Sequence, residues 1–304
     1  MTDKQNSLPR RMRELVERAA GLSSIPVAVV DAAEEHVIVG ACEASRAGLI
    51  DPILIGHRPD IERVMAEQGL EKDAYPIVEA ESELEAAELG VQKVLDGQAA
   101  ALMKGWIHTD VLLHPVLMHL RTARRVSHIF VVELASYPKL LFVTDAAINI
   151  VPDLMTKAAI VQNAVDLARL FGIDRPKVAA LSAVEEIKPA IVSTIDAACL
   201  SKMAERGQIR HAVVDGPLAF DNAISKEAAL TKKIESEVSG DVDILLAPDL
   251  ASGNILAKDL EYLAAATMGG IVVGAKVPIM LPSRSDPPSA RLVSAAIAVI
   301  IHHA

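Results

Sequence analysis

The sequence predicts an α/β fold with mostly parallel sheets, and three observations lead to this. Short apolar runs of strand length alternate with helical stretches along the chain of 304 residues. Hydrophobic residues make up 51% of the chain but aromatic residues only 3%, so Ala, Val, Leu and Ile must build the core. Small aliphatic residues suit strands that helices bury on both faces. We therefore expect three-layer α/β/α domains.

The alternation of strands and helices can be followed in order. The apolar run "IPVAVVDA" predicts the first strand, and "HVIVGACEASRAGL" predicts a short strand that leads into a helix. Helices of about 10–18 residues between strands require crossover connections, and hence parallel pairing. A final helix is expected over about 287–303. The other expected strands cover 51–56, 75–80, 99–105, 128–134, 140–146, 177–182, 211–216, 243–248, 271–275 and 277–283.

Composition excludes several classes of function. The formal net charge of -10 argues against nucleic acid or an anionic membrane as a partner. The two cysteines have no metal-binding spacing, and the N-terminal segment has no apolar leader core. GxGxxG, GxxxxGK[ST], GxSxG and HExxH are all absent, so the standard dinucleotide, P-loop, hydrolase and zinc motifs do not occur. We expect a cytoplasmic protein of ordinary size for two domains, without a metal site.

The segment "PSRSDPP" (282–288) follows an apolar strand. In open α/β sheets, ligands bind beyond the carboxyl ends of strands. Arg284 offers a planar fork of donors to a phosphate, and the flanking serines add hydroxyl groups. The alternative is that Ser285 or Asp286 only caps the final helix, with Arg284 in solvent.

Three further strand ends carry polar side chains. "APDLASGNI" contains Asp249, Gly253 and Asn254, and "VTDAAIN" contains Asp145. These residues suit either a ligand or simple caps and turns. "LMKGWIHTD" places Lys104, His108 and Thr109 beside the only tryptophan, which suits the phosphates and ring of a nucleotide-like ligand. The alternative is a Thr109 cap with Trp106 in the core.

Taken together, the segments of this chain resemble the phosphate acetyltransferase and phosphate butyryltransferase family, in collinear order over about 25–300. "DGPLAFDNA" and "LSAVEE" look closer to the butyryl branch. The segments that carry the resemblance are "KGWIHTDVLL", "TDAAINI", "VAALSAVEEIKP", "VDGPLAFDNAISKEAA", "DILLAPDLASGNILAKDLEYLA" and "VPIMLPSRSDP".

The resemblance implies a two-domain fold similar to isocitrate and isopropylmalate dehydrogenases. The first domain would be 1–126 plus 276–304, the second 127–275, with the active cleft between them. The implied reaction interconverts a short-chain acyl-CoA and inorganic phosphate with an acyl phosphate and CoA. It implies a ternary complex in a homodimer, with no prosthetic group and with coenzyme A as substrate or product.

The resemblance also implies roles for individual residues. Ser283 and Arg284 match the Ser-Arg pair of the family, so Arg284 would bind the phosphoryl group and Ser283 would donate to the developing oxyanion. The acetyl branch has an aspartate base a few residues further on, where this chain reads "PPSAR". Asp286 is the nearest carboxylate and is expected to be the base. Asp145 and Asp249 are the alternative bases.

The remaining predicted substrate contacts are divided between the two substrates. Asn254 and Gly253 are expected near the phosphate. Lys104, His108 and Thr109 are expected to line the CoA side.

Two other functions remain open on the residues. One is an NAD- and metal-dependent hydroxyacid dehydrogenase on the same fold, which would need clustered carboxylates such as Asp145, Asp243 and Asp249. The other is a regulator that binds acyl-CoA or acyl phosphate without catalysis.

Overall fold

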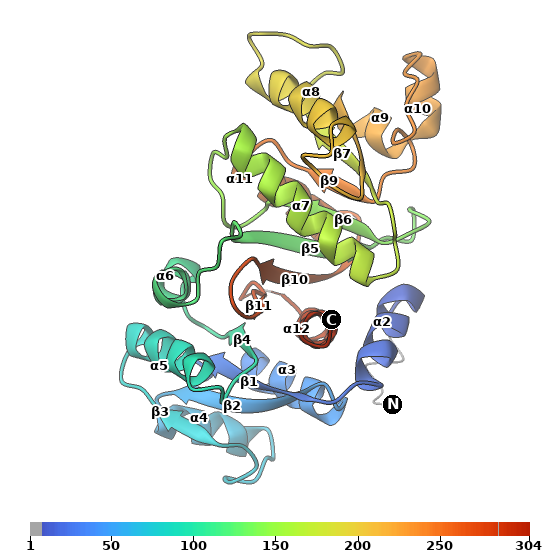
Figure 1. Ribbon diagram of the computed structural model, residues 1–304. Coiled ribbons are helices and arrows are strands. Elements are labelled where there is room, and N and C mark those ends of the chain that lie inside the picture. Colours follow the sequence, from blue (N-terminus) through green and yellow to red (C-terminus); the bar gives the residue numbers. More distant parts are fainter. Residues whose placement is uncertain (1–7, 285) are drawn as a thin grey trace. The chain divides into compact units, whose positions relative to one another are not determined.

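The computed structural model describes residues 8–284 and 286–304, and the chain divides into two compact units (Figure 1). Unit 1 is Met1–Arg124 with Thr267–Ala304, and unit 2 is Arg125–Ala266. Each unit has a mostly parallel sheet with helices on both faces, so the predicted α/β class is confirmed. The expected domain boundaries at 126 and 275, as borders of independent domains, stay a prediction.

The sheet of unit 1 has the strand order β3-β2-β1-β4-β11-β10. The first five strands run parallel, whereas β10 is antiparallel to β11. Parallel strands share one carboxyl edge, so the residues that follow β1, β4 and β11 come together there. The strands are β1 Ile25–Val30, β2 Ile50–Gly56, β3 Ile77–Glu79, β4 Ala101–Lys104, β10 Thr267–Val273 and β11 Ile279–Met280.

Helices cover both faces of this sheet (Figure 1). Helices α2, α3 and α12 lie on one face, α5 and α6 lie on the other, and α4 packs on β2 and β3. The helices of unit 1 are α2 Arg10–Ala20, α3 Glu35–Arg46, α4 Arg58–Glu67, α5 Glu83–Leu95, α6 Thr109–His119 and α12 Pro288–His302.

Helix α3 occupies the segment where the sequence predicted a short strand, so that prediction is wrong. The Glu34 side chain accepts a hydrogen bond from the Val37 backbone nitrogen and thereby caps the helix. Val37, Ile38 and Ala41 are buried with helical spacing against the core. An apolar run of this length fits either structure by pattern alone, and the cap decides the outcome here.

Helix α12 is the central helix of unit 1, because every residue from Ala290 to Ile300 is buried. The Ser294 hydroxyl donates to the Ala290 carbonyl and accepts from the Gly270 backbone nitrogen, which fixes the helix to β10. A Cβ atom on Gly269 would lie 2.6 Å from a Val293 methyl group, so the glycine permits this close packing.

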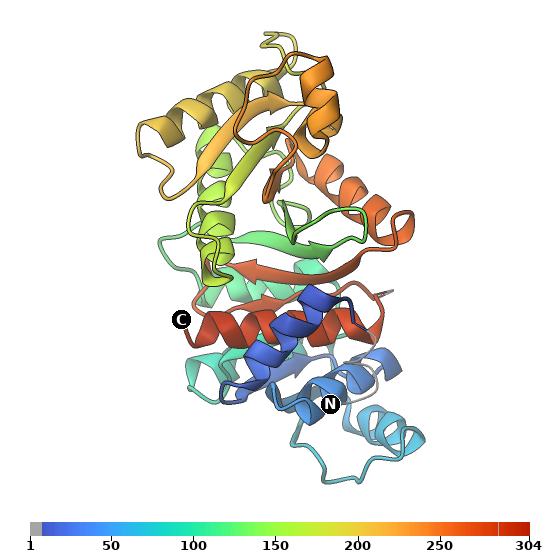
Figure 2. The same ribbon diagram turned by 90° about the vertical axis from the view of Figure 1, so that its right-hand side faces the viewer.

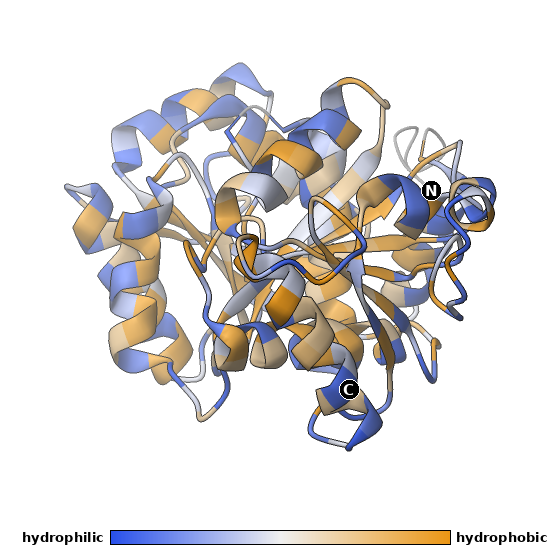
Figure 3. Ribbon diagram, turned by 90° about the horizontal axis from the view of Figure 1, so that it is seen from above, coloured by the Kyte–Doolittle hydropathy of each residue, from blue (hydrophilic) through white to orange (hydrophobic). Residues whose placement is uncertain are grey.

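The sheet of unit 2 has the strand order β5-β6-β9-β7-β8. Strands β6, β9, β7 and β8 are parallel, and β5 is antiparallel to β6. Most of the buried residues in these strands are aliphatic, although Phe130 and Phe142 are aromatic and His128 is polar. Figure 3 shows that hydrophobic residues predominate in the strands of the protein. The strands are β5 Ser127–Glu133, β6 Leu141–Thr144, β7 Lys177–Leu181, β8 Val213–Leu218 and β9 Ile244–Leu246.

Helices α7 and α11 lie on opposite faces of this second sheet (Figure 2). Helices α7, α8 and α11 follow β6, β7 and β9, so their N-termini lie at the carboxyl edge of the sheet. The helices of unit 2 are α7 Leu154–Leu170, α8 Val192–Glu205, α9 Phe220–Ile224, α10 Lys226–Thr231 and α11 Leu250–Tyr262.

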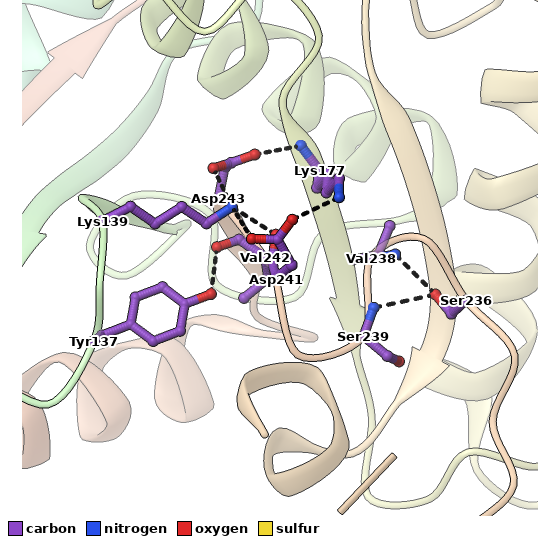
Figure 4. Close-up of polar contacts among 9 residues, drawn as sticks. All are labelled: Tyr137, Lys139, Lys177, Ser236, Val238, Ser239, Asp241, Val242 and Asp243. Carbon is purple, nitrogen blue, oxygen red and sulfur yellow. Dashed lines mark hydrogen bonds and ion pairs between the residues drawn. The ribbon is translucent and has the colours of Figure 1, made fainter. Parts of the chain in front are cut away.

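A network of ion pairs lies at the amino edge of the unit 2 sheet, opposite the carboxyl edge (Figure 4). Lys139 Nζ lies 2.9 Å from Asp241 Oδ1 and 2.7 Å from Asp243 Oδ1. Lys177 Nζ lies 2.6 Å from Asp241 Oδ2, and the Tyr137 hydroxyl donates to the Val242 carbonyl. The network ties the β5–β6 connection to the starts of β7 and β9.

Candidate active site

The ends of β1 and β4 bring Asp31 and Lys104 next to each other in unit 1. Val30 and Lys104 are register partners, and the backbone nitrogens of Gly105 and Trp106 donate to the Val30 and Asp31 carbonyls. A Cβ atom on Gly105 would lie only 2.1 Å from the Asp31 carbonyl oxygen, so a glycine is required. Asp31 itself has a left-handed φ of 59°, which is uncommon for a residue with a side chain.

Arg284 stacks on Trp106, with the guanidinium carbon 4.8 Å from the ring centroid. Trp106 is 43% exposed, so the alternative of a core tryptophan is wrong. A flat guanidinium on an aromatic face loses less conformational entropy when it binds a phosphate, because the stack already holds its plane. This contact places Arg284 beside the segment that contains Lys104.

The loop after β11 forms a turn around Ser283. The Ser283 backbone nitrogen donates to Asp286 Oδ2 at 2.7 Å, and the Asp286 backbone nitrogen donates to the Ser283 carbonyl at 3.2 Å. The Asp286 carbonyl accepts from Arg291 Nη1 at 3.2 Å. Asp286 is 5% exposed, and its hydrogen bond with the Ser283 backbone nitrogen stabilises the turn that contains Ser283 and Arg284. The catalytic roles expected for Ser283, Arg284 and Asp286 stay predictions. The alternative that Asp286 caps the final helix is wrong, because Pro287 is the N-cap residue of α12 and no side-chain hydrogen bond caps it among the described residues. Ser285, the other alternative cap, lies outside the described residues.

Burial, together with the neighbouring cations Arg284 and Arg291, lowers the pKa of Lys104 to about 8. The charges of Asp286 and Asp31 oppose this effect. Burial and the charge of Glu83 raise the pKa of Asp31. An anion bound beside Lys104 would relieve the repulsion among the cations, so the cluster is suited to an anionic ligand.

His108 and Thr109 lie where β4 leads into α6. The N-cap residue of α6 is His108, and Thr109 is the first helical residue, so the alternative of a Thr109 cap is wrong. The His108 side chain makes no capping hydrogen bond. The His108 backbone nitrogen donates to Glu83 Oε2 at 3.2 Å, and the His108 side chain is exposed. Contact of His108 and Thr109 with CoA stays a prediction.

In unit 2, Asp145 closes a turn at the end of β6. Its carboxylate accepts hydrogen bonds from the backbone nitrogens of Ala147, Ile148 and Asn149. Asn149 Nδ2 donates to Asp145 Oδ2 at 2.6 Å, and Arg125 Nε donates to Asn149 Oδ1 at 2.8 Å. The carboxylate of Asp145 is thus engaged with its own turn.

Gly253 and Asn254 lie against this turn, on the first turns of α11. A Cβ atom on Gly253 would lie 2.3 Å from the Asp145 carbonyl oxygen, and Asn254 Nδ2 donates to the Ala146 carbonyl at 3.2 Å. Three of the four residues predicted in unit 2 are therefore brought together. Their contact with phosphate stays a prediction.

Asp249 is the N-cap of α11, since its carboxylate accepts from the Ser252 backbone nitrogen at 2.8 Å. It also lines a cavity of about 820 Å³ in unit 2. The cavity has apolar walls, hydroxyl groups and the ion pair of Lys157 and Asp196 at 2.7 Å. The lining residues are Val151, Pro152, Asp153, Leu154, Lys157, Leu181, Ser182, Ala183, Val192, Ser193, Asp196, Phe220, Pro248, Asp249 and Ser252.

Sequence reasoning missed Asp31 and Arg291. Asp31 directly follows the first apolar run, so its place at a strand end was a usable signal. Arg291 lies within a buried helix and is 0% exposed, and only its charge inside an apolar segment marked it.

The carboxylates that a dehydrogenase would need do not meet. Asp243 precedes β9 and binds Lys139, whereas Asp249 follows β9 and caps α11. Across residues 8–284 and 286–304, no group of three or more His, Cys, Asp or Glu side chains could hold a metal ion. No helix within the same ranges combines the length and apolar character needed to cross a membrane.

The fold and the cluster define a class of protein: an α/β chain with a cationic site at the carboxyl edge of a parallel sheet. Comparison with known proteins gives the family. The family described as phosphate acetyl/butaryl transferase matches residues 80–299, and this chain belongs to it. The phosphate acetyltransferase of Rickettsia prowazekii is 50% identical over 293 residues, 95% of this chain and 84% of the relative. The phosphate butyryltransferase of Clostridium acetobutylicum is 39% identical over 295 residues, 96% of this chain and 98% of the relative.

Solved structures agree with the family. A branched-chain phosphotransacylase from Enterococcus faecalis V583 matches with a TM-score of 0.80 and 32% identity, covering 92% of this chain and 99% of that one. A 4-hydroxythreonine-4-phosphate dehydrogenase from Klebsiella pneumoniae matches with a TM-score of 0.56 and 12% identity over 92% of this chain and 100% of that one, which shows a shared fold alone. The predicted family is therefore confirmed.

Proposed function

We propose that the protein interconverts a short-chain acyl-CoA and inorganic phosphate with an acyl phosphate and CoA. The observation that carries this proposal is the similarity, over nearly the full chain, to relatives named phosphate acetyltransferase and phosphate butyryltransferase. The cationic cluster of unit 1 supports it, because both substrates are anions. A dehydrogenase is not favoured, since Asp243 and Asp249 lie at opposite ends of β9.

In this proposal Arg284 binds the phosphate and Ser283 donates a hydrogen bond to the carbonyl oxygen as negative charge develops on it. A preorganised donor of this kind contributes about 3 kcal/mol to such a reaction. The two substrates react directly in a ternary complex. Burial raises the pKa of Cys42, which makes that thiol a poor nucleophile for a covalent intermediate.

The first acyl group to test is acetyl. Relatives named phosphate acetyltransferase in Rickettsia and Rhizobium meliloti are 46–50% identical to this chain, whereas those named phosphate butyryltransferase in Clostridium are 36–39% identical. The segments that resemble the butyryl branch keep butyryl-CoA in the panel. One methylene group changes specificity by only about 10–200-fold, so overlap is expected.

Further parts of the proposal concern the state of the protein. We propose a cytoplasmic homodimer that uses coenzyme A as substrate or product and needs no prosthetic group. The cavity of unit 2 has the apolar walls and few polar groups that suit the organic part of CoA. That the reaction takes place in a cleft between two domains stays a prediction.

The test is a thiol-release assay on the purified protein with acetyl-, propionyl- and butyryl-CoA, each with phosphate and with sulfate as the matched anion. We expect CoA release that requires phosphate, and an acyl phosphate as the second product. Release that sulfate supports equally would contradict the proposal. Tight CoA binding without turnover would favour a regulator, and NADH formation from a hydroxyacid would favour a dehydrogenase.

A further inference from the structure

Lys104, the last residue of β4, is a buried residue of unit 1. Lys104 is 4% exposed, and within residues 8–284 and 286–304 its side chain makes no hydrogen bond or ion pair. Buried lysines are normally paired, because an isolated charge is expensive to remove from water. An unpaired amine at a strand end therefore points to a ligand or to a proton.

Lys104 lies at the same edge of the sheet as the loop that carries the predicted reacting groups. Met103 and Met280 are register partners, so Lys104 ends β4 beside the segment of β11 that continues to Ser283. Trp106, two residues after Lys104, stacks on Arg284. The phosphate-binding arginine and the unpaired amine thus belong to the same carboxyl edge.

A second cation, Arg291 on α12, acts electrostatically on this amine. Arg291 is 0% exposed, and its Nε and Nη2 atoms have no hydrogen-bond partner among the residues that the structure describes. Helix α3 packs against α12 and has Gly40 opposite Arg291. A Cβ atom on Gly40 would lie 2.5 Å from Arg291 Cδ. A glycine inside a helix costs about 1 kcal/mol, so α3 gives up stability to admit this cation.

We propose that the Lys104 amine carries the proton that moves between the phosphate and the CoA sulfur, an inference that rests on the proposed function. In acyl phosphate formation, a phosphate oxygen attacks the carbonyl carbon, the C–O bond forms and the C–S bond breaks with its electron pair on sulfur. The Lys104 ammonium gives its proton to that sulfur and then takes the proton of the phosphoryl hydroxyl. In reverse, the neutral amine takes the thiol proton and returns it to the leaving phosphate.

The acidity of the amine matches this task. The pKa of Lys104 is about 8, and a free thiol has a pKa of about 8.5, so proton transfer between them is nearly thermoneutral. The pKa of a carboxylic acid is about four units below that of this amine, so a carboxylate is a weaker base than the amine toward a thiol. Asp286 and Asp145 are also engaged by backbone nitrogens, which leaves Lys104 as the better candidate.

The charged groups around Lys104 come from several elements. Asp31 follows β1, Arg284 and Asp286 follow β11, and Arg291 lies on α12. Further out, Glu83 begins α5 and acts on Asp31, and Glu34 precedes α3 and acts on Arg291.

The first test compares Lys104→Met, Lys104→Arg and the exposed control Lys72→Met in the full chain. We expect kcat to fall about 10²–10⁴-fold in both Lys104 variants and to stay unchanged in the control, because arginine keeps the charge but does not release a proton. Retained kcat in Lys104→Arg with a raised KM for phosphate would overturn proton transfer in favour of charge alone. A wild-type protein without phosphate-dependent CoA release would instead refute the proposed function.

Two further tests remain informative even if the Lys104→Arg variant does not fold. Added methylamine is expected to restore part of the kcat of Lys104→Ala. In the direction that forms acyl-CoA, the rescued rate should rise in proportion to the concentration of unprotonated methylamine. Absence of rescue by any small amine would contradict the proposal. The second test is the alkaline limb of kcat for acyl phosphate formation. It should move to higher pH in Arg291→Met and to lower pH in Asp31→Asn. A limb that moves in neither variant would overturn the assignment.

Discussion

Replacing Lys104 by Met is expected to stabilise the folded protein at neutral pH. The pKa of Lys104 falls from its ordinary 10.5 to about 8 on folding, and each pH unit is worth 1.36 kcal/mol, so the protonated lysine costs about 3 kcal/mol. The cost is fully present below pH 8, where Lys104 is protonated in both the folded and the unfolded protein. It declines between pH 8 and 10.5, because there only the unfolded chain still holds the proton.

The assay is urea unfolding of the wild-type protein and Lys104→Met at pH 7.0 and 9.5, followed by the fluorescence of the only tryptophan, which lies in unit 1. The advantage of the variant should shrink by about 2 kcal/mol between these two pH values. Packing of the methionine adds an offset that does not depend on pH, so the change with pH isolates the charge. An advantage that stays constant from pH 7.0 to 9.5 would refute the low pKa of Lys104.

Three further changes test the packing of unit 2. Gly253→Ala places a Cβ atom 2.3 Å from the Asp145 carbonyl, so we expect a loss of about 1–3 kcal/mol in thermal unfolding and a weakened phosphate dependence of turnover. Asp249→Ala removes the cap of α11 and should cost about 1 kcal/mol in urea unfolding, whereas Asp249→Ser should keep most of it. Lys139→Met leaves the buried Asp243 without its ion pair, so the urea midpoint should fall at pH 7 while kcat is unchanged; an unchanged midpoint would show that the network is dispensable.

Much of the fold could be predicted from the sequence, because apolar runs bounded by polar strand ends mark buried parallel strands. The ends of β4, β6 and β9 were found at Lys104, Asp145 and Asp249 for this reason. The sequence predicts a strand leading into a helix where α3 lies, because a short apolar run fits both patterns and only the cap from Glu34 decides between them. The antiparallel pairing of β5 with β6 leaves no trace in a pattern of consecutive apolar runs.

The site was predicted only as separate clusters. The sequence indicated Arg284 but not the ring that supports it, because Trp106 could equally have filled the core. Arg291 was missed, since a charge inside an apolar helix gives no sign of which side chains surround it. The low pKa of Lys104 depends on burial and on cations distant in the sequence, and only the folded arrangement reveals it.

The most direct test of the whole account measures how CoA release from acetyl-CoA depends on phosphate concentration in the wild-type protein and in Arg284→Ala. A planar cation that grips the reacting oxyanion should be worth about 3 kcal/mol, so turnover should drop roughly 100-fold and saturation should require far more phosphate. Identical phosphate curves for the two proteins would contradict the account.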